Sequence, residues 1–576
     1  MMNPQGQQRN ILRLAAKGGL LWLLFSFCTA THGQSSLGIA RPFVPPDSLF
    51  TNWDQPDDPG GLVMVMQGEE VLWQQTYGMA HLSQKRLNQL NQPMSLASVS
   101  KQFAATCIAL LEEQGKLSIE DPITKYYPEF QAESEIKIRN LLDHSSGLRD
   151  GYVLALLTMG LRGLRYEQVE PKELVAMVAE QRELNFTPGS EFAYTNTNYV
   201  MLADLVERVS GQSLREYADS AIFRPLGMTN TYFNDVAGAD GPEGYVQKKP
   251  GKYTRRMVRG GVVGDSHLVS TLPDLAQWEA NMWNNRLGKG DPALIQRMWT
   301  PTHLNDGSSS GYGYGVSVSE REGVRWVEHG GDNDIQTSII IRVPEHQLSV
   351  VILANSNRYA DTSEKGWALA HHCLGIQSSG ANAPEAMTWD TLALSAEQLS
   401  RYEGIYGYVR PNSLGVWREA KVKEGTLWMT GAPSHPGLPL LPVAENHFVA
   451  INREGRALHL YFEEEAGKLK GFREEFPTYE VPFEFKYLAN HSPSLKAYRG
   501  IYHHADTGAR LQIRTRKGKL QARVRLMRLT LIPFGTDQYY EPGEGTLFLF
   551  ERDENGLVTK LTVNARDFRN FTVYKE

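Results

Sequence analysis

The sequence has little cysteine, no excess of charge of one sign, and no long apolar run beyond its N-terminal segment. Its three cysteines, Cys28, Cys107 and Cys373, are too few for a disulfide framework. A formal net charge of -6 over 576 residues leaves no basic footprint, which argues against nucleic acid as a partner. No later stretch holds about 18 uninterrupted apolar residues, so no membrane span is predicted after the N-terminal segment.

What the chain does contain is enough apolar sequence for a large core. Hydrophobic residues make up 41% and charged residues 22%, as in a globular protein. At about 150 residues per domain, the length suggests roughly three or four units.

The N-terminal segment has the pattern of a secretory signal peptide. Three basic residues precede a short apolar run at 19–25, and small and polar residues follow up to Gln34. We therefore predict a signal peptide over residues 1–33 and a periplasmic or secreted protein. Cys28 suggests a lipoprotein, but a lipid-attachment signal has a small residue where this chain has the bulky Phe27. A lipoprotein is therefore a weaker prediction than a soluble exported protein. An uncleaved membrane anchor is the other alternative.

Strand patterns at both ends of the first part of the chain enclose a mainly helical region. Apolar runs predict strands at 61–66 and 70–77, then again at 337–343 and 348–354, with a further strand near Trp326. Helices are expected between about 117 and 283, and a last one near 364–374. This order predicts an α+β fold in which N- and C-terminal segments share one sheet.

The tail contains a duplication. Residues 399–406 and 495–502 begin alike, with Tyr402 and Tyr498 separated by 96 residues, and each copy continues with short alternating strands. We predict two small antiparallel β-barrels, since closure removes exposed strand edges. The expected domains are 34–377 for the first part, 386–488 for one barrel and 493–576 for the other, with a linker near 376–385.

Ser98 and Lys101 begin a predicted helix that runs to about Gln114 and stops at Gly115. Their spacing places both on one face, where the amine could accept the hydroxyl proton and helix N–H groups could hold an oxyanion. Alone, the pattern is at chance level, and its plain alternative is a helix cap with a solvated lysine.

Three further stretches add to this pattern. Tyr194 and Asn196 end a turn before a helix, and Tyr could relay protons while Asn binds a substrate amide. His329-Gly330-Gly331 precedes the returning strands, where glycines allow close approach of a substrate backbone. The stretch 141–148 contains His144, which we interpret as a structural hydrogen-bonding residue.

Together these elements resemble the serine β-lactamase and penicillin-binding-protein superfamily on its class C-like branch, over about residues 43–374. The Ser-x-x-Lys, Tyr-x-Asn and His-x-Gly elements stand in the order of that branch. The resemblance implies an α+β catalytic domain with its site between a helical lobe and a sheet. The tail is similar to the paired β-barrels of exported D-aminopeptidases.

On this resemblance Ser98 attacks a carbonyl and forms an acyl-enzyme, and Lys101 and Tyr194 carry the proton. Asn196, His329, Gly330, Gly331 and Asp332 are implied to bind the substrate, with the backbone N–H groups of Ser98 and Asp332 as the oxyanion hole. Neither a metal nor a cofactor is expected. The stretch from Gly264 to Leu268 misses the last glycine of a Gly-x-Ser-x-Gly elbow, which counts against an α/β-hydrolase.

The departures from the pattern concern the substrate. Lactam-binding members have Lys where this chain has His329, which can supply only a weaker, pH-dependent charge for a substrate carboxylate. The resemblance implies that members with His at this position are more often esterases, D-amino-acid peptidases or amidases. The acidic Asp332-Asn333-Asp334 would suit a substrate ammonium.

We therefore expect a serine hydrolase that acts on a small peptide, amide or ester. The sequence leaves open whether the substrate derives from peptidoglycan and whether the protein is a homodimer. The alternatives are a β-lactamase or D-Ala-D-Ala carboxypeptidase and, in another class, a catalytically silent cell-wall-binding or sensor protein.

Overall fold

The computed structural model describes most of the chain from Phe43 to Glu576. The residues outside the description are 1–42, 47, 54, 56, 131–134, 160–168, 182, 250, 322, 360, 377–390, 409–416, 431–436, 452–456, 476–482, 489–493, 506, 525–526, 536, 542–545 and 566–567. The predicted signal peptide thus lies outside the described residues. Among the helices that are described, none combines the length and apolar character needed to cross a bilayer.

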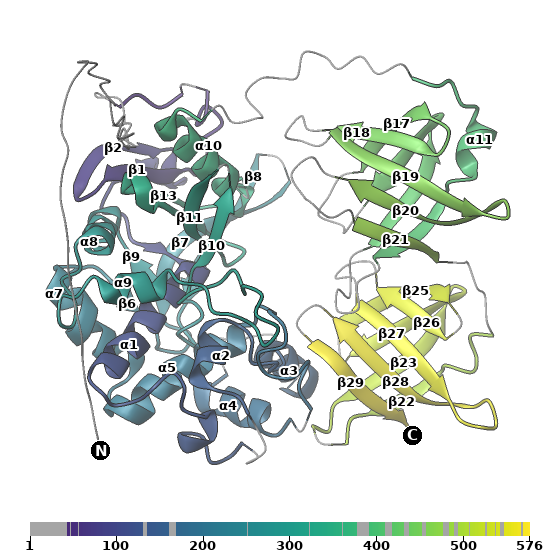
Figure 1. Cartoon of the computed structure of the whole chain (residues 1–576), viewed down its shortest axis with the longest axis horizontal. Helices are drawn as coiled ribbons and strands as arrows, with labels where there is room; N and C mark the ends of the chain where they lie inside the picture. The colour runs from purple at the N-terminus through teal and green to yellow at the C-terminus, as the bar shows by residue number, and fades with distance from the viewer. Residues whose placement is uncertain are drawn as a thin grey trace, which may run out of the picture. The chain divides into compact units, whose positions relative to one another are not determined.

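A six-stranded antiparallel sheet forms the centre of the first part of the chain (Figure 1). Its strands, in spatial order, are β10 (Ser317–Arg321), β11 (Val324–Asp332), β12 (Thr337–Val343), β13 (Leu348–Ala354), β1 (Gly61–Gln67) and β2 (Glu70–Tyr77). The N-terminal β1 pairs with β13, with Gly61 opposite Ala354 and Gln67 opposite Leu348. The prediction that both ends of this part share one sheet is confirmed.

The two faces of the sheet belong to two apolar cores. Along β1, Leu62, Met64 and Met66 face the larger core with the helices, whereas Val63 and Val65 face a second core. This alternation follows from the two-residue period of a strand. Helix α10 (Thr362–Leu374) covers the second face and packs on β12 and β13 (Figure 1).

The larger core is built from helices between the first and last strands of the sheet. They are α1 (Lys101–Glu113), α2 (Ile138–Leu142), α3 (Gly151–Met159), α4 (Pro171–Ala179), α5 (Asn196–Ser210), α6 (Leu214–Ala218), α7 (Arg224–Leu226), α8 (Leu272–Trp283) and α9 (Ala293–Met298). Helix α1 ends at the predicted place, since Gln114 is its C-cap and Gly115 has φ +71°.

The region predicted as mainly helical also contains short strands. They are β3 (Met79–His81), β4 (Arg86–Leu87), β5 (Met94–Ser95), β6 (Tyr232–Phe233), β7 (Asp240–Lys249), β8 (Lys252–Arg259) and β9 (Leu268–Ser270). The β7–β8 hairpin was not predicted, because its residues are mostly polar and only partly buried, so no apolar alternation marks it.

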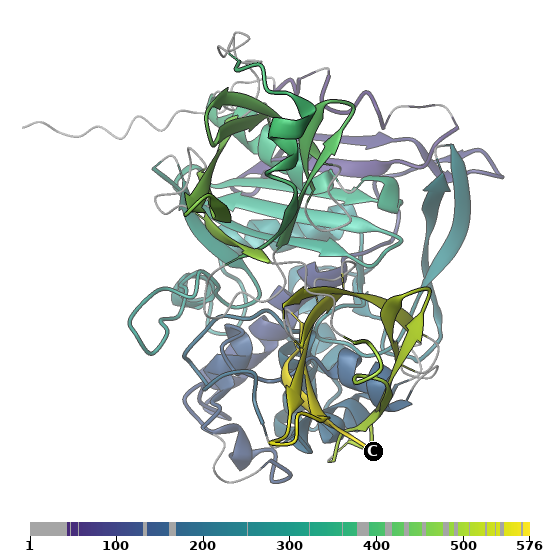
Figure 2. The ribbon, with the colours of Figure 1, turned by 90° about the vertical axis from the view of Figure 1, so that its right-hand side faces the viewer.

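The tail forms two closed antiparallel barrels, as predicted (Figure 2). After the short helix α11 (Ala396–Ser400), the first contains β14 (Gly404–Tyr408), β15 (Trp417–Lys423), β16 (Thr426–Thr430), β17 (Leu438–Ala444), β18 (His447–Ile451), β19 (Ala457–Glu465), β20 (Lys468–Glu475) and β21 (Phe483–Leu488). The second contains β22 (Gly500–His503), β23 (Arg510–Arg516), β24 (Lys519–Val524), β25 (Met527–Gly535), β26 (Gln538–Glu541), β27 (Thr546–Arg552), β28 (Val558–Ala565) and β29 (Phe568–Lys575).

The two barrels repeat the same internal bond. The Tyr406 hydroxyl donates to the Tyr402 carbonyl at 2.7 Å, and the Tyr502 hydroxyl donates to the Tyr498 carbonyl at 2.8 Å. These buried tyrosines explain the sequence repeat at the start of each copy. The predicted domain boundaries lie in or beside stretches outside the description and stay predictions.

Candidate active site

A short 3-10 turn carries the predicted nucleophile into α1. This turn, η1 (Ala97–Ser100), leads directly to Lys101, so Ser98 and Lys101 lie three residues apart at the start of the helix. Ala97 has φ +46°, a left-handed conformation that costs a non-glycine residue about 1–3 kcal/mol. The Ser100 hydroxyl closes the turn, since it donates to the Ala97 carbonyl at 2.5 Å and accepts from the Leu268 N–H at 3.0 Å.

The Lys101 side chain is fully buried, and its amine has three oxygen partners. Nζ donates to Ser98 Oγ at 3.2 Å, to Asn196 Oδ1 at 2.9 Å and to the Asp265 carbonyl at 2.8 Å. These acceptors match the three donors of an ammonium group. The same nitrogen lies 4.8 Å from the centroid of the Tyr194 ring. The predicted Ser, Lys, Tyr and Asn residues therefore meet around one nitrogen.

Tyr194 and Asn196 are placed by a ladder of backbone bonds to the loop at 143–147. The N–H groups of Asn185, Gly189 and Ala193 donate to the carbonyls of Gly147, Ser145 and His144 at 2.7, 2.8 and 2.9 Å. A Cβ on Gly147 would lie 2.1 Å from the Phe186 carbonyl oxygen, and its φ is +75°, so the approach of the two segments requires glycine. Helix α5 then begins at Asn196.

His144 lies beneath Tyr194, as a structural residue. It is fully buried, the two ring centroids are 4.4 Å apart, and its Nδ1 accepts from the Thr195 N–H at 3.3 Å. Burial, together with the nearby charge of Lys101, lowers the pKa of His144 well below its usual value. The ring is therefore neutral at physiological pH and supports the tyrosine by packing.

His329 faces the same region from strand β11. Its Nδ1 donates to the Gly330 carbonyl at 2.6 Å, so Nε2 accepts from the Tyr312 hydroxyl at 2.8 Å. Burial and the charge of Lys101 lower the pKa of His329 to about 3. The weak pH-dependent charge expected from the sequence is therefore absent at neutral pH.

The glycines after His329 differ in their surroundings. A Cβ on Gly331 would lie 2.3 Å from the Leu96 carbonyl oxygen, whereas one on Gly330 would meet nothing closer than 3.5 Å. Gly331 thus brings β11 against the segment that leads into Ser98. Asp332 follows at the exposed end of the strand, where its Oδ1 accepts from the Asp334 N–H at 2.7 Å.

Three contacts of the site were not predicted. The Asp265 carbonyl holds Lys101, Tyr312 fixes the His329 ring, and Gln102 anchors α1 through bonds to Trp278 and Arg342. A backbone carbonyl has no signal in the sequence, and no pattern in the sequence links Tyr312 to His329. Each contact depends on tertiary structure.

A cavity of about 330 Å³ opens beside Tyr194 and His329. Its remaining walls are Phe192, Tyr312, Ser317, Glu328, Gly330, Ile339, Ser363 and Trp367. The lining includes the aromatic side chains of Phe192, Tyr194, Tyr312 and Trp367 and one carboxyl group, that of Glu328. This acid was not predicted, although it directly precedes His329.

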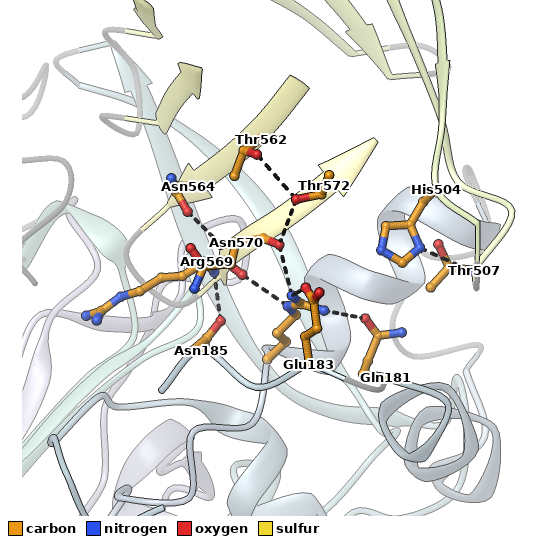
Figure 3. Close-up of polar contacts among 11 residues, drawn as sticks. Gln181, Glu183, Asn185, His504, Thr507, Thr562, Asn564, Arg569, Asn570 and Thr572 are labelled. Atoms are coloured by element: carbon orange, nitrogen blue, oxygen red, sulfur yellow. Dashed lines mark hydrogen bonds and ion pairs between the residues drawn. The ribbon is translucent and has the colours of Figure 1, made fainter. Parts of the chain in front are cut away.

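The second barrel is bonded to the segment that precedes Tyr194 (Figure 3). The Arg569 N–H donates to Asn185 Oδ1 at 2.7 Å, and the Arg569 guanidinium pairs with Glu191 at 2.9 Å. From the other side, the buried Arg149 guanidinium donates to the carbonyls of Arg569 and Asn570 at 3.1 Å. The start of β29 thus contacts the segment that carries the candidate tyrosine.

Comparison with known proteins identifies relatives of the first part of the chain. Residues 50–373 match the family profile described as Beta-lactamase. The chain is 30% identical over 331 residues to a D-aminopeptidase of Brucella anthropi, a match that covers 57% of this chain and 62% of the relative. It is 28% identical over 382 residues to Penicillin-binding protein 4* of Bacillus subtilis (strain 168), covering 62% of this chain and 82% of the relative.

A solved structure is similar in fold. The octameric penicillin-binding protein homologue from Pyrococcus abyssi aligns with a TM-score of 0.51 at 23% identity, over 74% of this chain and 96% of that chain. At this identity the likeness supports the fold alone.

Proposed function

Because the chain belongs to the beta-lactamase family of serine hydrolases, we propose that it hydrolyses a peptide or amide bond through an acyl-enzyme at Ser98. The observation that carries this proposal is the contact set of Lys101, whose Nζ bonds both Ser98 Oγ and Asn196 Oδ1 beside the Tyr194 ring. A serine and a lysine in contact, with a tyrosine next to them, form a nucleophile with a proton relay.

In the proposed first step, Ser98 Oγ bonds to the substrate carbonyl carbon, and its proton passes to the Lys101–Tyr194 pair. The carbonyl oxygen becomes an oxyanion held by the backbone N–H groups of Ser98 and Asp332. Tyr194 then delivers the proton to the leaving nitrogen as the carbon–nitrogen bond breaks. Water, deprotonated through the same pair, attacks the acyl-enzyme and releases the acid and free Ser98.

The surroundings of His329 favour a substrate without a carboxylate at this wall of the site. A ring that is neutral at physiological pH provides no positive charge, which argues against an efficient β-lactamase or a D-Ala-D-Ala carboxypeptidase. The match to D-aminopeptidase makes D-amino-acid peptides and amides our preferred substrates. Since the match spans 62% of that relative, its activity is transferred to this chain as a proposal.

Labelling with a fluorophosphonate probe tests the nucleophile. We expect a covalent adduct on Ser98 that is lost in Ser98→Ala, and the absence of an adduct on the native chain would support a catalytically silent binding protein instead. A parallel screen compares D- and L-amino-acid p-nitroanilides with p-nitrophenyl esters. Hydrolysis of the D-anilides supports the proposal, whereas nitrocefin turnover at the rate of known lactamases would contradict it.

The proposal includes export, because residues 1–33 carry the pattern of a signal peptide. Peptidoglycan fragments would then be within reach as substrates. N-terminal sequencing of the protein recovered from the periplasm or medium tests export, since cleavage near Gln34 is expected. Light scattering on the purified protein tests the homodimer.

A further inference from the structure

The cavity beside Tyr194 contains one carboxyl group that the proposed mechanism does not use. Glu328 lies on β11 directly before His329 and lines this cavity together with four aromatic side chains, those of Phe192, Tyr194, Tyr312 and Trp367. The volume of about 330 Å³ corresponds to roughly ten water molecules at about 30 Å³ each. It is therefore large enough for a substrate group of several heavy atoms.

Glu328 has one oxygen without a partner. Its Oε2 is buried and accepts no hydrogen bond, and among the described residues Glu328 forms no ion pair. The Trp367 side chain supplies a hydrogen bond to this carboxyl group. A buried acceptor left unsatisfied costs about 1–3 kcal/mol, and more when it is charged. Glu328 thus contributes to the cavity lining a carboxyl group that has no ion-pair partner among the described residues.

None of the described charged groups near Glu328 forms an ion pair with it. Arg321, on the neighbouring strand β10, stacks on Trp367 with its guanidinium 4.6 Å from the ring centroid, and it forms no ion pair with Glu328. His371 on α10 packs against Trp367, with ring centroids 5.8 Å apart. His329 is neutral at physiological pH, and Lys101 is bound to its three oxygen acceptors.

We propose that this cavity receives the leaving group of the substrate and that Glu328 binds a primary ammonium group on it, as on a diamine or a lysine side chain. The assignment to the leaving group rests on the proposed function, in which Tyr194 protonates the leaving nitrogen. Since the Tyr194 ring forms one wall of the cavity, the departing group lies next to it. Aromatic faces and a carboxylate both attract a cation, whereas a carboxylate in the same place would be repelled.

Three amides of D-alanine that differ only at the far end of the leaving amine test this selectivity. Their amines are pentylamine, 1,5-diaminopentane and 6-aminohexanoate, which end in a methyl, an ammonium and a carboxylate group. We expect kcat/KM for the aminopentyl amide to exceed that for the pentyl amide by about 10- to 100-fold, the range for a hydrogen bond to a charged group. The carboxylate-bearing amide should be the slowest of the three.

The Glu328→Gln variant should reduce the preference for the aminopentyl amide over the pentyl amide to less than about threefold. Glu320→Gln is the matched control, because Glu320 is an exposed acid on β10 outside the cavity lining, and it should keep the full preference. A preference that survives in Glu328→Gln, or that is absent from the native protein, would overturn the proposal.

Binding separates this proposal from the proposed function. Calorimetric titration of the same amides into Ser98→Ala, and into Ser98→Ala with Glu328→Gln, requires no turnover. Tighter binding of the aminopentyl amide that is lost with Glu328→Gln supports the cation site even if no amide is hydrolysed. Equal affinity of Ser98→Ala for the aminopentyl and pentyl amides rejects the site even if Ser98 proves to be the nucleophile.

Discussion

The Tyr312 hydroxyl lies 2.8 Å from Nε2 of His329 and donates to it, while the Nδ1 of the same ring donates to the Gly330 carbonyl. Both ring nitrogens are therefore satisfied in the neutral form. Addition of a proton at Nε2 would place a second donor against the Tyr312 hydroxyl, within a buried site that already contains Lys101. The His329 ring is uncharged for this reason.

Acid should destabilise the protein partly through His329. Its pKa is lowered to about 3 in the folded chain, whereas an unfolded histidine titrates near 6.5. The unfolded chain thus binds more protons below pH 6.5, and stability is lost as the pH falls from 6.5 towards 3. The titration of His329 should lower the free energy of unfolding by about 3 kcal/mol between pH 7 and pH 4.

Denaturant unfolding of the native protein and of His329→Gln at pH 7 and pH 4 measures this contribution of His329 to the loss of stability. The variant should lose less stability on acidification, although not none, because His144 is also buried and neutral. An identical loss in both proteins would show that His329 is protonated in the folded state.

The two adjacent glycines of β11 should respond differently to alanine. In Gly331→Ala the new Cβ would lie 2.3 Å from the Leu96 carbonyl oxygen, which forces β11 away from the turn that carries Ser98. Because Asp332 follows on this strand, the oxyanion donors would separate, and kcat/KM should fall by about 10²- to 10³-fold. In Gly330→Ala the nearest atom is 3.5 Å away, so the loss should stay below about tenfold. Equal losses in the two variants would contradict this account.

The sequence predicts the sheet and the barrels because their residues carry periodic signals. Strands β12 and β13 are buried throughout and appear as short apolar runs, and the barrels repeat the Tyr402 and Tyr498 pattern. The β7–β8 hairpin has no such signal. Its side chains pair with one another, as Arg255 does with Glu243, and few of its described side chains are apolar and buried, as Tyr245 and Val258 are.

The sequence predicts which residue types form the candidate site but not their protonation states. Order along the chain brings Ser98, Tyr194 and His329 together, yet their surroundings depend on burial that no linear pattern gives. For this reason the acid chosen from the sequence was Asp332, which is exposed and bonded within its own loop. Glu328 stands four residues earlier, and only the fold shows that it lines the cavity.

The buried ion pair beneath α1 should be costly to break. The Arg342 guanidinium contacts both oxygens of Glu279 at 2.7 Å, both side chains are fully buried, and Arg342 also donates to Gln102 Oε1 at 2.7 Å. Glu279→Gln removes the negative charge and leaves Arg342 uncompensated, which should lower the free energy of unfolding by about 3–5 kcal/mol. Arg224→Gln breaks an exposed pair with Asp219 and should cost at most about 1 kcal/mol. Urea unfolding of both variants checks the difference, and similar midpoints would refute it.

Arg149 should couple the second barrel to the segment before Tyr194. Its side chain is 2% exposed and bonds Gln181, Glu183 and two backbone carbonyls at the start of β29. Arg149→Met keeps the apolar stem but loses these bonds, so unfolding should become easier by about 1.5–3 kcal/mol. Hydrogen exchange should rise at residues 183–195, and kcat should fall more than KM changes. Arg510→Gln, at an exposed pair with Glu576, serves as the control that leaves exchange in this segment unaltered.

Selectivity for a cationic leaving group should strengthen with pH. Burial raises the pKa of Glu328 to about 7, against the opposing charge of Arg321. Below that value the carboxyl group is protonated and attracts an ammonium weakly, and above it the carboxylate is charged. The ratio of kcat/KM for the aminopentyl and pentyl amides should therefore rise from pH 5.5 to pH 8.5 and reach a plateau. Groups that act equally on both substrates cancel in this ratio. A change of the ratio with pH therefore reflects titration within the cavity. The same ratio should stay flat in Glu328→Gln, and a rise of equal size in that variant would assign the titration to another group.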